Sequence, residues 1–279
     1  MHWSNGLRPD TDTPIMTRYL TYPAALIAAL FLPLAQAAPA TTASGSELAV
    51  TLGAYRYEEP GLMSLQGMKS GLNLQTTRAY PERRTFLRGE LRIAIGTADY
   101  RSNGTGSHAR EPDWYLEGRA LIGNDWPLDS ALLSTYVGLG YRFLLNDGRG
   151  LTSTGHAGYR RESNYLYLPV GIILQTALQE GTLRTRIEYD HLLNGNQYTR
   201  LSDTGLGYAD VNNKQSTGQG IKLQLTYMTP EWFAGPYLHY WDIADSAVTA
   251  FYQNGVIAGY GLEPKNRTTE IGFEFGRPF

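Results

Sequence analysis

The sequence predicts an all-β protein, a transmembrane antiparallel up-and-down β-barrel of about ten strands. Apolar and polar residues alternate with a period of two through most of the chain after residue 46, as in strands with one apolar face. The connections between these segments alternate between short and long, and a targeting segment precedes them. The composition agrees, because 31 glycines and 20 tyrosines favour pleated sheet over helix.

The charge and cysteine content exclude several classes of protein. The formal net charge is -2, whereas nucleic-acid-binding proteins usually carry a basic excess, so we expect no nucleic-acid partner. The chain has no cysteine, which excludes a disulfide scaffold and a thiolate metal site. We find no signature of a cofactor site and expect none.

The targeting segment is the continuous apolar run 24–34, which follows the basic residue Arg18. The small residues of Ala35-Gln36-Ala37 come directly after it, and these three parts together are typical of a secretory signal peptide. The run is about half the length of a spanning helix, which makes an uncleaved anchor the weaker interpretation. We predict cleavage after Ala37.

The chain then divides into three parts. Residues 1–37 form a leader and signal peptide, within which Met16 is the natural start of the signal and Met1 remains the alternative. Residues 38–46 are small and polar and predict a flexible linker. Residues 47–279 form the barrel.

The clearest strand signal is 87–95, where Leu91 and Ile93 alternate with Glu90 and Arg92. Nine further segments have the same alternation. They are 48–54, 68–75, 114–122, 133–143, 165–174, 183–190, 221–227, 232–241 and 270–275.

Four connections are long and polar, namely 101–112, 146–163, 193–217 and 243–266, and the connections that alternate with them are tight. Short periplasmic turns opposite long extracellular loops are typical of bacterial outer-membrane barrels. A soluble two-sheet sandwich also has period-two strands, but it does not require this asymmetry. The first outer connection, 58–65, is an exception because it is short.

The polar faces of the strands carry both signs of charge. In a narrow barrel these side chains would meet in the lumen as a paired network, since a buried charge without a partner costs several kcal/mol. The predicted network consists of Arg88, Glu90, Arg92, Glu117, Arg119, Arg142, Arg184, Arg186, Glu188 and Asp190.

Aromatic residues gather near the ends of the expected strands, where barrels place interfacial girdles. The residues concerned are Tyr55, Tyr57, Trp114, Tyr141, Phe143, Tyr165, Tyr167, Tyr189, Tyr227, Tyr240 and Trp241.

The C-terminal sequence TTEIGFEFGRPF resembles the closing strand of Gram-negative outer-membrane barrels, with Ile271, Phe273 and Phe275 alternating before a terminal Phe279. The chain is therefore similar to the small porin-like or OmpA-like barrel families. The resemblance implies that these residues are the signal for the barrel-assembly machinery. It also implies periplasmic chaperones, outer-membrane lipids and lipopolysaccharide as partners.

Catalytic residues are not evident. Asp190-His191 is similar to the Asp–His pair of omptin proteases, but adjacent strand residues point to opposite faces. Candidate acidic partners such as Asp99 and Glu111 are scattered, and His108 lies in an outer loop. We therefore expect a non-enzymatic barrel, either a narrow porin-like channel or a structural and surface-interaction protein. The alternatives are an enzyme (lipase, protease or lipid A modifier) at the extracellular rim and an adhesin acting through 193–217 and 243–266.

Overall fold

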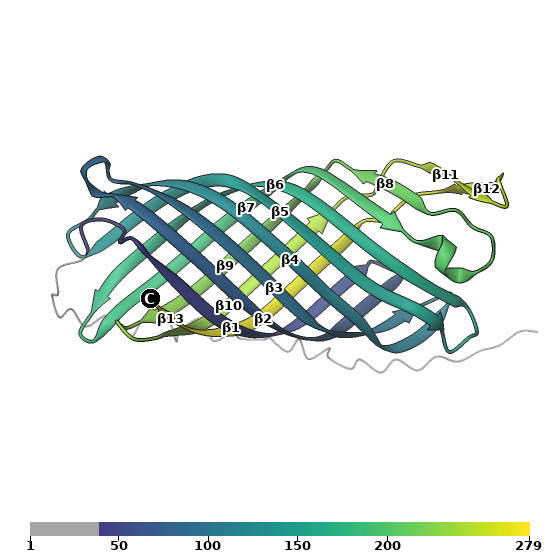
Figure 1. The fold of residues 1–279 in the computed structure, drawn as a ribbon, viewed down its shortest axis with the longest axis horizontal. Coiled ribbons are helices and arrows are strands. Elements are labelled where there is room, and N and C mark those ends of the chain that lie inside the picture. Colours follow the sequence, from purple (N-terminus) through teal and green to yellow (C-terminus); the bar gives the residue numbers. More distant parts are fainter. Residues whose placement is uncertain (1–38) are drawn as a thin grey trace, which may run out of the picture. The chain divides into compact units, whose positions relative to one another are not determined.

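The computed structural model describes residues 39–279, so the expected signal peptide and its cleavage site lie outside the described residues. Within this part, ten antiparallel strands form a closed barrel, which confirms the predicted fold class (Figure 1). The barrel strands are β1 (Gly45–Glu59), β2 (Met63–Tyr80), β3 (Thr85–Ser102), β4 (Gly106–Pro127), β5 (Ala131–Leu151), β6 (Ala157–Leu178), β7 (Gly181–Thr199), β9 (Gly218–Met228), β10 (Phe233–Ile243) and β13 (Asn266–Pro278).

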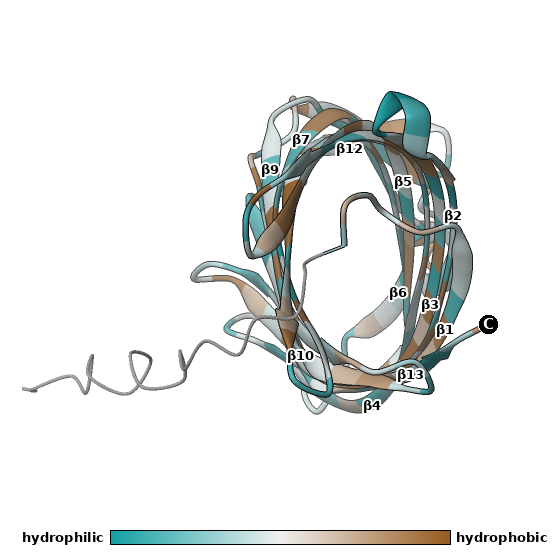
Figure 2. Cartoon of the chain, turned by 90° about the vertical axis from the view of Figure 1, so that its left-hand side faces the viewer, coloured by the Kyte–Doolittle hydropathy of each residue, from teal (hydrophilic) through white to brown (hydrophobic). Residues whose placement is uncertain are grey.

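The barrel closes because the last strand pairs with the first. β13 and β1 are antiparallel, with Phe275 opposite Val50, and every other barrel strand pairs with its two neighbours. Seen along the axis, the strands form a continuous ring (Figure 2). Closure satisfies the backbone hydrogen bonds within the sheet, which a sheet in lipid requires.

Three further strands extend one end of the barrel (Figure 1). β8 (Val211–Gln215) pairs with the end of β7, and β11 (Thr249–Gln253) forms a hairpin with β12 (Val256–Gly261). The short helices are η1 (Pro81–Arg83) and η2 (Leu201–Thr204). None of the helical segments in residues 39–279 has the length and apolar character that crossing a membrane requires.

The short turns after β2, β4, β6 and β9 lie at the end of the barrel that holds the chain's C-terminus, which is therefore the periplasmic end. The long connections lie at the opposite, extracellular end. They contain more strand than expected: 101–112 is largely the paired ends of β3 and β4, and 146–163 is largely those of β5 and β6. Strand pairing continues into these segments because the backbone N–H and C=O groups of each segment are hydrogen-bonded to the neighbouring strand.

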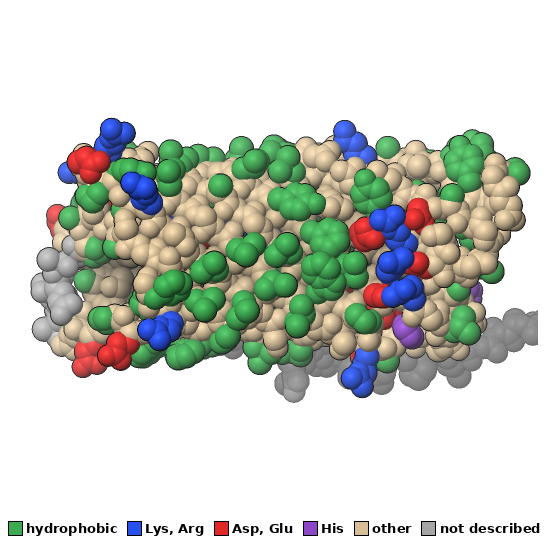
Figure 3. All heavy atoms as spheres, viewed as in Figure 1, with side chains coloured by type: hydrophobic (Ala, Val, Ile, Leu, Met, Phe, Trp, Pro, Cys, Tyr) green, Lys and Arg blue, Asp and Glu red, His purple; other side chains and the backbone are tan. Residues whose placement is uncertain are grey.

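The two faces of the strands have different environments. Leu91 and Ile95 on β3 are 48% and 59% exposed, whereas Arg92 between them is 7% exposed. Apolar side chains cover the middle of the outer surface, and charged side chains gather towards its ends (Figure 3). The apolar band is the surface that contacts lipid in a barrel of this kind.

β1 begins at Gly45, two residues before the predicted start of the barrel at residue 47. The linker is also anchored. The backbone N–H and the hydroxyl of Thr42 both donate to the Asp125 carboxylate, at 2.7 and 2.8 Å, and Thr42 is buried. Asp125 lies at the end of β4, far from Thr42 in the sequence. Local composition cannot predict a contact of this kind.

The prediction of aromatic girdles is wrong for five residues whose side chains lie inside the barrel: Tyr55, Tyr57, Tyr165, Tyr167 and Trp241. Tyr141 and Tyr189 are exposed on the outer surface. Alternation decides the face of each residue, and closeness to a strand end does not.

Candidate functional site: the charged interior of the barrel

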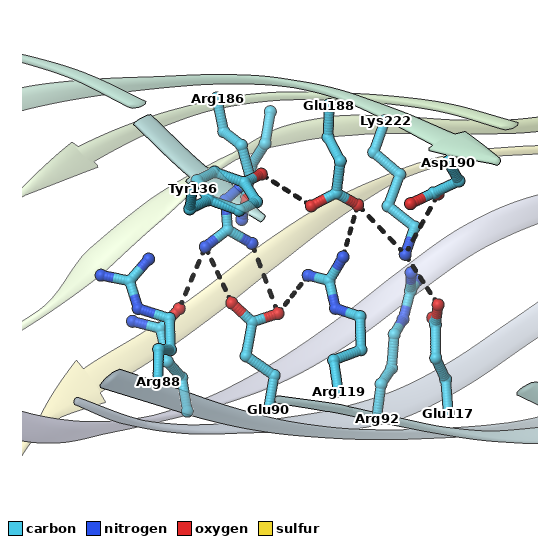
Figure 4. A network of polar contacts seen from close by, with 12 residues as sticks. Arg88, Glu90, Arg92, Glu117, Arg119, Tyr136, Arg186, Glu188, Asp190 and Lys222 are labelled. Atoms are coloured by element: carbon cyan, nitrogen blue, oxygen red, sulfur yellow. Dashed lines mark hydrogen bonds and ion pairs between the residues drawn. The ribbon is translucent and has the colours of Figure 1, made fainter. Parts of the chain in front are cut away.

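Alternation along the strands brings all ten charged residues of the predicted network into the barrel interior. Eight are buried and the other two, Glu90 and Arg119, are partly buried. Figure 4 shows most of them reaching towards one another from different walls of the barrel.

Arg119 on β4 joins two carboxylates. It forms ion pairs with Glu90 on the neighbouring β3 and with Glu188 on β7. Glu90 also accepts from Arg186 on β7 at 2.8 Å, and Glu188 accepts from the hydroxyl of Tyr136 at 2.6 Å. These contacts connect opposite walls of the barrel in one layer.

Lys222 on β9 is the centre of a second layer. Its Nζ lies 2.7 Å from Glu117 Oε1, 3.4 Å from Glu188 Oε1 and 3.6 Å from Asp190 Oδ2. Asp190 is fully buried, and neither of its oxygens accepts a hydrogen bond within the described chain. One ammonium group therefore contacts three carboxylates, and Arg119 supplies a second positive charge to Glu188.

Glu270 on β13 collects three donors. Arg92 Nη2 lies 2.6 Å away, and the hydroxyls of Tyr115 and Tyr237 donate at 2.9 and 2.8 Å. The Arg92 guanidinium also contacts His239 and lies over the ring of Tyr237 at 4.8 Å. A carboxylate with this number of donors is well compensated for its burial.

Further pairs lie towards the two ends of the barrel. Glu47 accepts from both terminal nitrogens of Arg184 at 2.8 Å near the periplasmic end. Glu59 accepts from Arg161 at 2.8 Å near the extracellular end. Polar crosslinks therefore occur along the whole length of the lumen.

Two members of the predicted network have no ion-pair partner within residues 39–279. Arg142 lies over the ring of Tyr115, with 4.7 Å between the guanidinium carbon and the ring centroid. Arg88 donates from Nε to the Thr77 hydroxyl at 3.0 Å and lies beside the ring of Phe86.

Several residues that complete the network were not among those predicted. They are Glu47, Lys69, Asp113, Lys222, Glu270 and Glu274. Lys222 and Glu270 occupy the polar positions of alternating strands, so the same period-two signal could have found them. The partners across the lumen could not be found in this way, because they depend on barrel closure.

Inner tyrosines lie over glycines of neighbouring strands. A Cβ placed on Gly140 would lie 2.2 Å from the Cζ of Tyr167, and one on Gly171 would lie 2.3 Å from the hydroxyl of Tyr136. Because glycine has no side chain, Tyr167 can donate to Glu117 and Tyr136 can donate to Glu188. The glycine content thus has a structural role in the interior.

Little space remains between the crosslinked layers of the barrel. A cavity of about 70 Å³ lies among Glu90, Arg92, Glu117, Arg119 and Lys222. Such a volume holds only a few water molecules.

The residues considered for catalysis do not come together. Asp190 is buried in the lumen, whereas His191 and Asp99 are exposed on the outer surface. His108 lies 3.1 Å from Glu111 at the extracellular end. In the described part of the chain, no group of three or more His, Cys, Asp or Glu side chains is arranged to hold a metal ion.

Comparisons with known proteins support the architecture. The outer-membrane protease OmpT of Escherichia coli matches over 86% of this chain and 100% of its own, with a TM-score of 0.54 and 11% identity. The fold is that of an integral outer-membrane β-barrel. The translocator domain of the autotransporter NalP from Neisseria meningitidis is also similar, with a TM-score of 0.39 and 10% identity over 84% of this chain and 88% of that domain.

An outer-membrane channel from Pseudomonas putida F1 matches over 86% of this chain and 97% of its own, with a TM-score of 0.39 and 11% identity. A scan against protein-family models and a search of curated proteins found no match. At these identities the similarity to solved structures defines the fold alone.

Proposed function

We propose that this chain is a non-enzymatic outer-membrane barrel that is closed by its own interior side chains. It serves as a structural and surface-interaction protein and admits at most a narrow path for water and small ions. The observation that supports this proposal best is the pair of crosslinked layers around Arg119 and Lys222.

The energetics of these layers favour the closed state. Removing one partner of a buried ion pair leaves an uncompensated charge and costs about 3–5 kcal/mol. A path wide enough for a sugar requires several of these pairs to separate together, because Arg119 and Lys222 share Glu188. A ten-stranded barrel is also only slightly wider than eight-stranded barrels, whose interiors are filled by side chains.

The location and partners are part of the proposal. The apolar outer surface suits contact with outer-membrane lipids and lipopolysaccharide. The closing strand, with Ile271, Phe273 and Phe275 exposed on the outer surface, supports assembly by the barrel-assembly machinery after export by the signal peptide. The same strand supports a relationship to the small porin-like or OmpA-like families.

The extracellular hairpin supports the surface-interaction role. The segment 246–262, which contains β11 and β12, has no charged residue. Val256 and Tyr260 are 70% and 69% exposed on β12. Exposed apolar groups of this kind are typical of surfaces that contact other molecules.

Proteoliposomes containing the refolded protein test the proposal. We expect no swelling in iso-osmotic arabinose with the unmodified protein and measurable swelling with the double variant Arg92→Ala, Arg186→Ala, which removes bulk and charge from the lumen. Swelling by the unmodified protein at the rate of an open porin would contradict the closed lumen.

A parallel assay tests the absence of enzymatic activity. We expect no phospholipase or protease turnover above that of empty liposomes. Turnover that disappears in His108→Ala or His191→Ala would instead establish an enzyme at the extracellular rim.

A further inference from the structure

We propose that the periplasmic mouth of the barrel contains a binding site for a small oxyanion, built around Arg88. A cavity of about 420 Å³ opens there, where the ends of several strands meet the segment that precedes β1. Its polar lining includes Thr42, Glu47, Thr77, Arg88, Gln175 and Arg184. This site is separate from the crosslinked layers and does not depend on the proposed function.

Arg88 is a buried cation without a counter-ion. Its side chain is 6% exposed, and no carboxylate of residues 39–279 lies within 4.0 Å of its guanidinium. The Nε donates to Thr77, but Nη1 has no hydrogen-bond partner in the described chain. Buried guanidinium groups are normally paired, so this arrangement points to a missing anion.

The neighbouring carboxylates Glu47 and Glu90 are paired with other arginines, and Glu274 accepts from Gln224 and Thr226. Glu47 binds both terminal nitrogens of Arg184, and Glu90 binds Arg186 and Arg119. Arg88 therefore has no ion-pair partner of its own in the described chain. An incoming anion would meet Arg88 without breaking an existing ion pair.

The donors present fit an oxyanion. A guanidinium stays charged and donates charge-assisted hydrogen bonds to phosphate or carboxylate. Thr77 accepts from Arg88 through its oxygen, which leaves its hydroxyl hydrogen to donate to a ligand. Gln175 on β6 adds an amide to the lining of the cavity, and inorganic phosphate and simple carboxylates share the required chemistry.

Calorimetric titration of the refolded mature protein in detergent micelles tests the site. Inorganic phosphate is the first probe and acetate the second, each at constant ionic strength with chloride as the reference. We expect saturable phosphate binding that is at least about tenfold weaker in Arg88→Gln, since the variant loses a charge-assisted contact. Acetate binding of similar strength would identify a carboxylate site, and preference for phosphate would identify a phosphate site.

The matched control is Arg78→Gln. Arg78 lies on β2 at the same end of the barrel but is exposed on the outer surface, so its removal changes the net charge equally and should leave binding unchanged. Absence of saturable binding in the unmodified protein, or equal binding by Arg88→Gln, would overturn the proposal.

A second measurement does not require the variant to fold. Phosphate that binds only the folded state must raise the urea midpoint of the unmodified protein relative to chloride at equal ionic strength. An unchanged midpoint would also overturn the proposal.

Discussion

Lys222 on β9 and Glu117 on β4 lie on opposite walls of the barrel, and the Nζ of Lys222 is 2.7 Å from the Oε1 of Glu117. This contact crosses the lumen at a level that Glu188 and Asp190 also reach (Figure 4). In this layer one buried lysine joins the two walls and contacts three carboxylates, of which Glu188 also pairs with Arg119.

Replacement of Lys222 by methionine should therefore strongly destabilise the barrel. We expect a loss of about 3–5 kcal/mol in the free energy of unfolding, because buried carboxylates lose their counter-ion. Urea titration in micelles measures the loss, and Glu117→Gln added to Lys222→Met should recover part of it. Lys265→Met is the control, since Lys265 is exposed at the extracellular end and its loss should have little effect.

The assignment of faces can be tested on two adjacent residues of β3. Ile93→Arg places a charge on the lipid-facing surface and should cost about 2–4 kcal/mol near the middle of the membrane. Arg92→Gln should act differently, through the lost pairing with Glu270. Adding Glu270→Gln should therefore recover stability for Arg92→Gln but not for Ile93→Arg. Equal behaviour of the two variants in urea titration would contradict the assignment.

The packing of tyrosine rings on glycines predicts the effect of a single methyl group. Gly140→Ala forces Tyr167 away from Glu117 and should cost about 1–3 kcal/mol, as overpacking does elsewhere. Gly118→Ala is the control, because a Cβ at Gly118 meets no described atom within 4 Å. The stability of the two variants can be compared by heat-modified gel mobility and by the midpoint of urea unfolding. A similar loss of stability in both variants would exclude the proposed packing.

The extracellular end should respond to pH through Glu263. Burial raises the pKa of Glu263 to about 7, with Glu59 adding to the rise and Arg161 opposing it, while Tyr57 donates to both carboxylates. Because the pKa in the folded state exceeds that of the free carboxyl, its contribution to stability is present at low pH. That contribution is lost as the pH rises through about 7.

Hydrogen exchange of the segment that joins β12 to β13 measures this effect. We expect larger protection factors, which are exchange rates corrected for intrinsic base catalysis, at pH 5.5 than at pH 8, and we expect Glu263→Gln to remove most of the difference. Glu231→Gln in a periplasmic turn is the control. Smaller protection factors at the lower pH would contradict the sign of this prediction.

Much of the fold could be predicted because alternation is a local property of the chain. The segment 87–95 shows this well, since the faces of Arg92 and Ile93 follow from sequence position alone. The length of the extracellular strands was not predictable, because pairing outside the membrane depends on the neighbouring strand and not on apolar periodicity.

The sequence could predict which residues face the barrel interior, but not which of them are in contact. The sequence places Arg119 and Glu188 on inward faces, but their contact requires strands β4 and β7 to face each other across a closed ring. The capture of Thr42 by Asp125 depends on closure in the same way. Contacts of this kind are set by the curvature and register of the whole sheet.

Single-channel recording in a planar lipid bilayer tests the closed lumen most directly. The refolded, unmodified protein should give only small and rare conductance steps, because the pairs around Arg119 and Lys222 occupy the lumen. The variant Arg92→Ala, Arg186→Ala should raise both their size and their frequency. Large, steady conductance in the unmodified protein would contradict the account and identify an open porin.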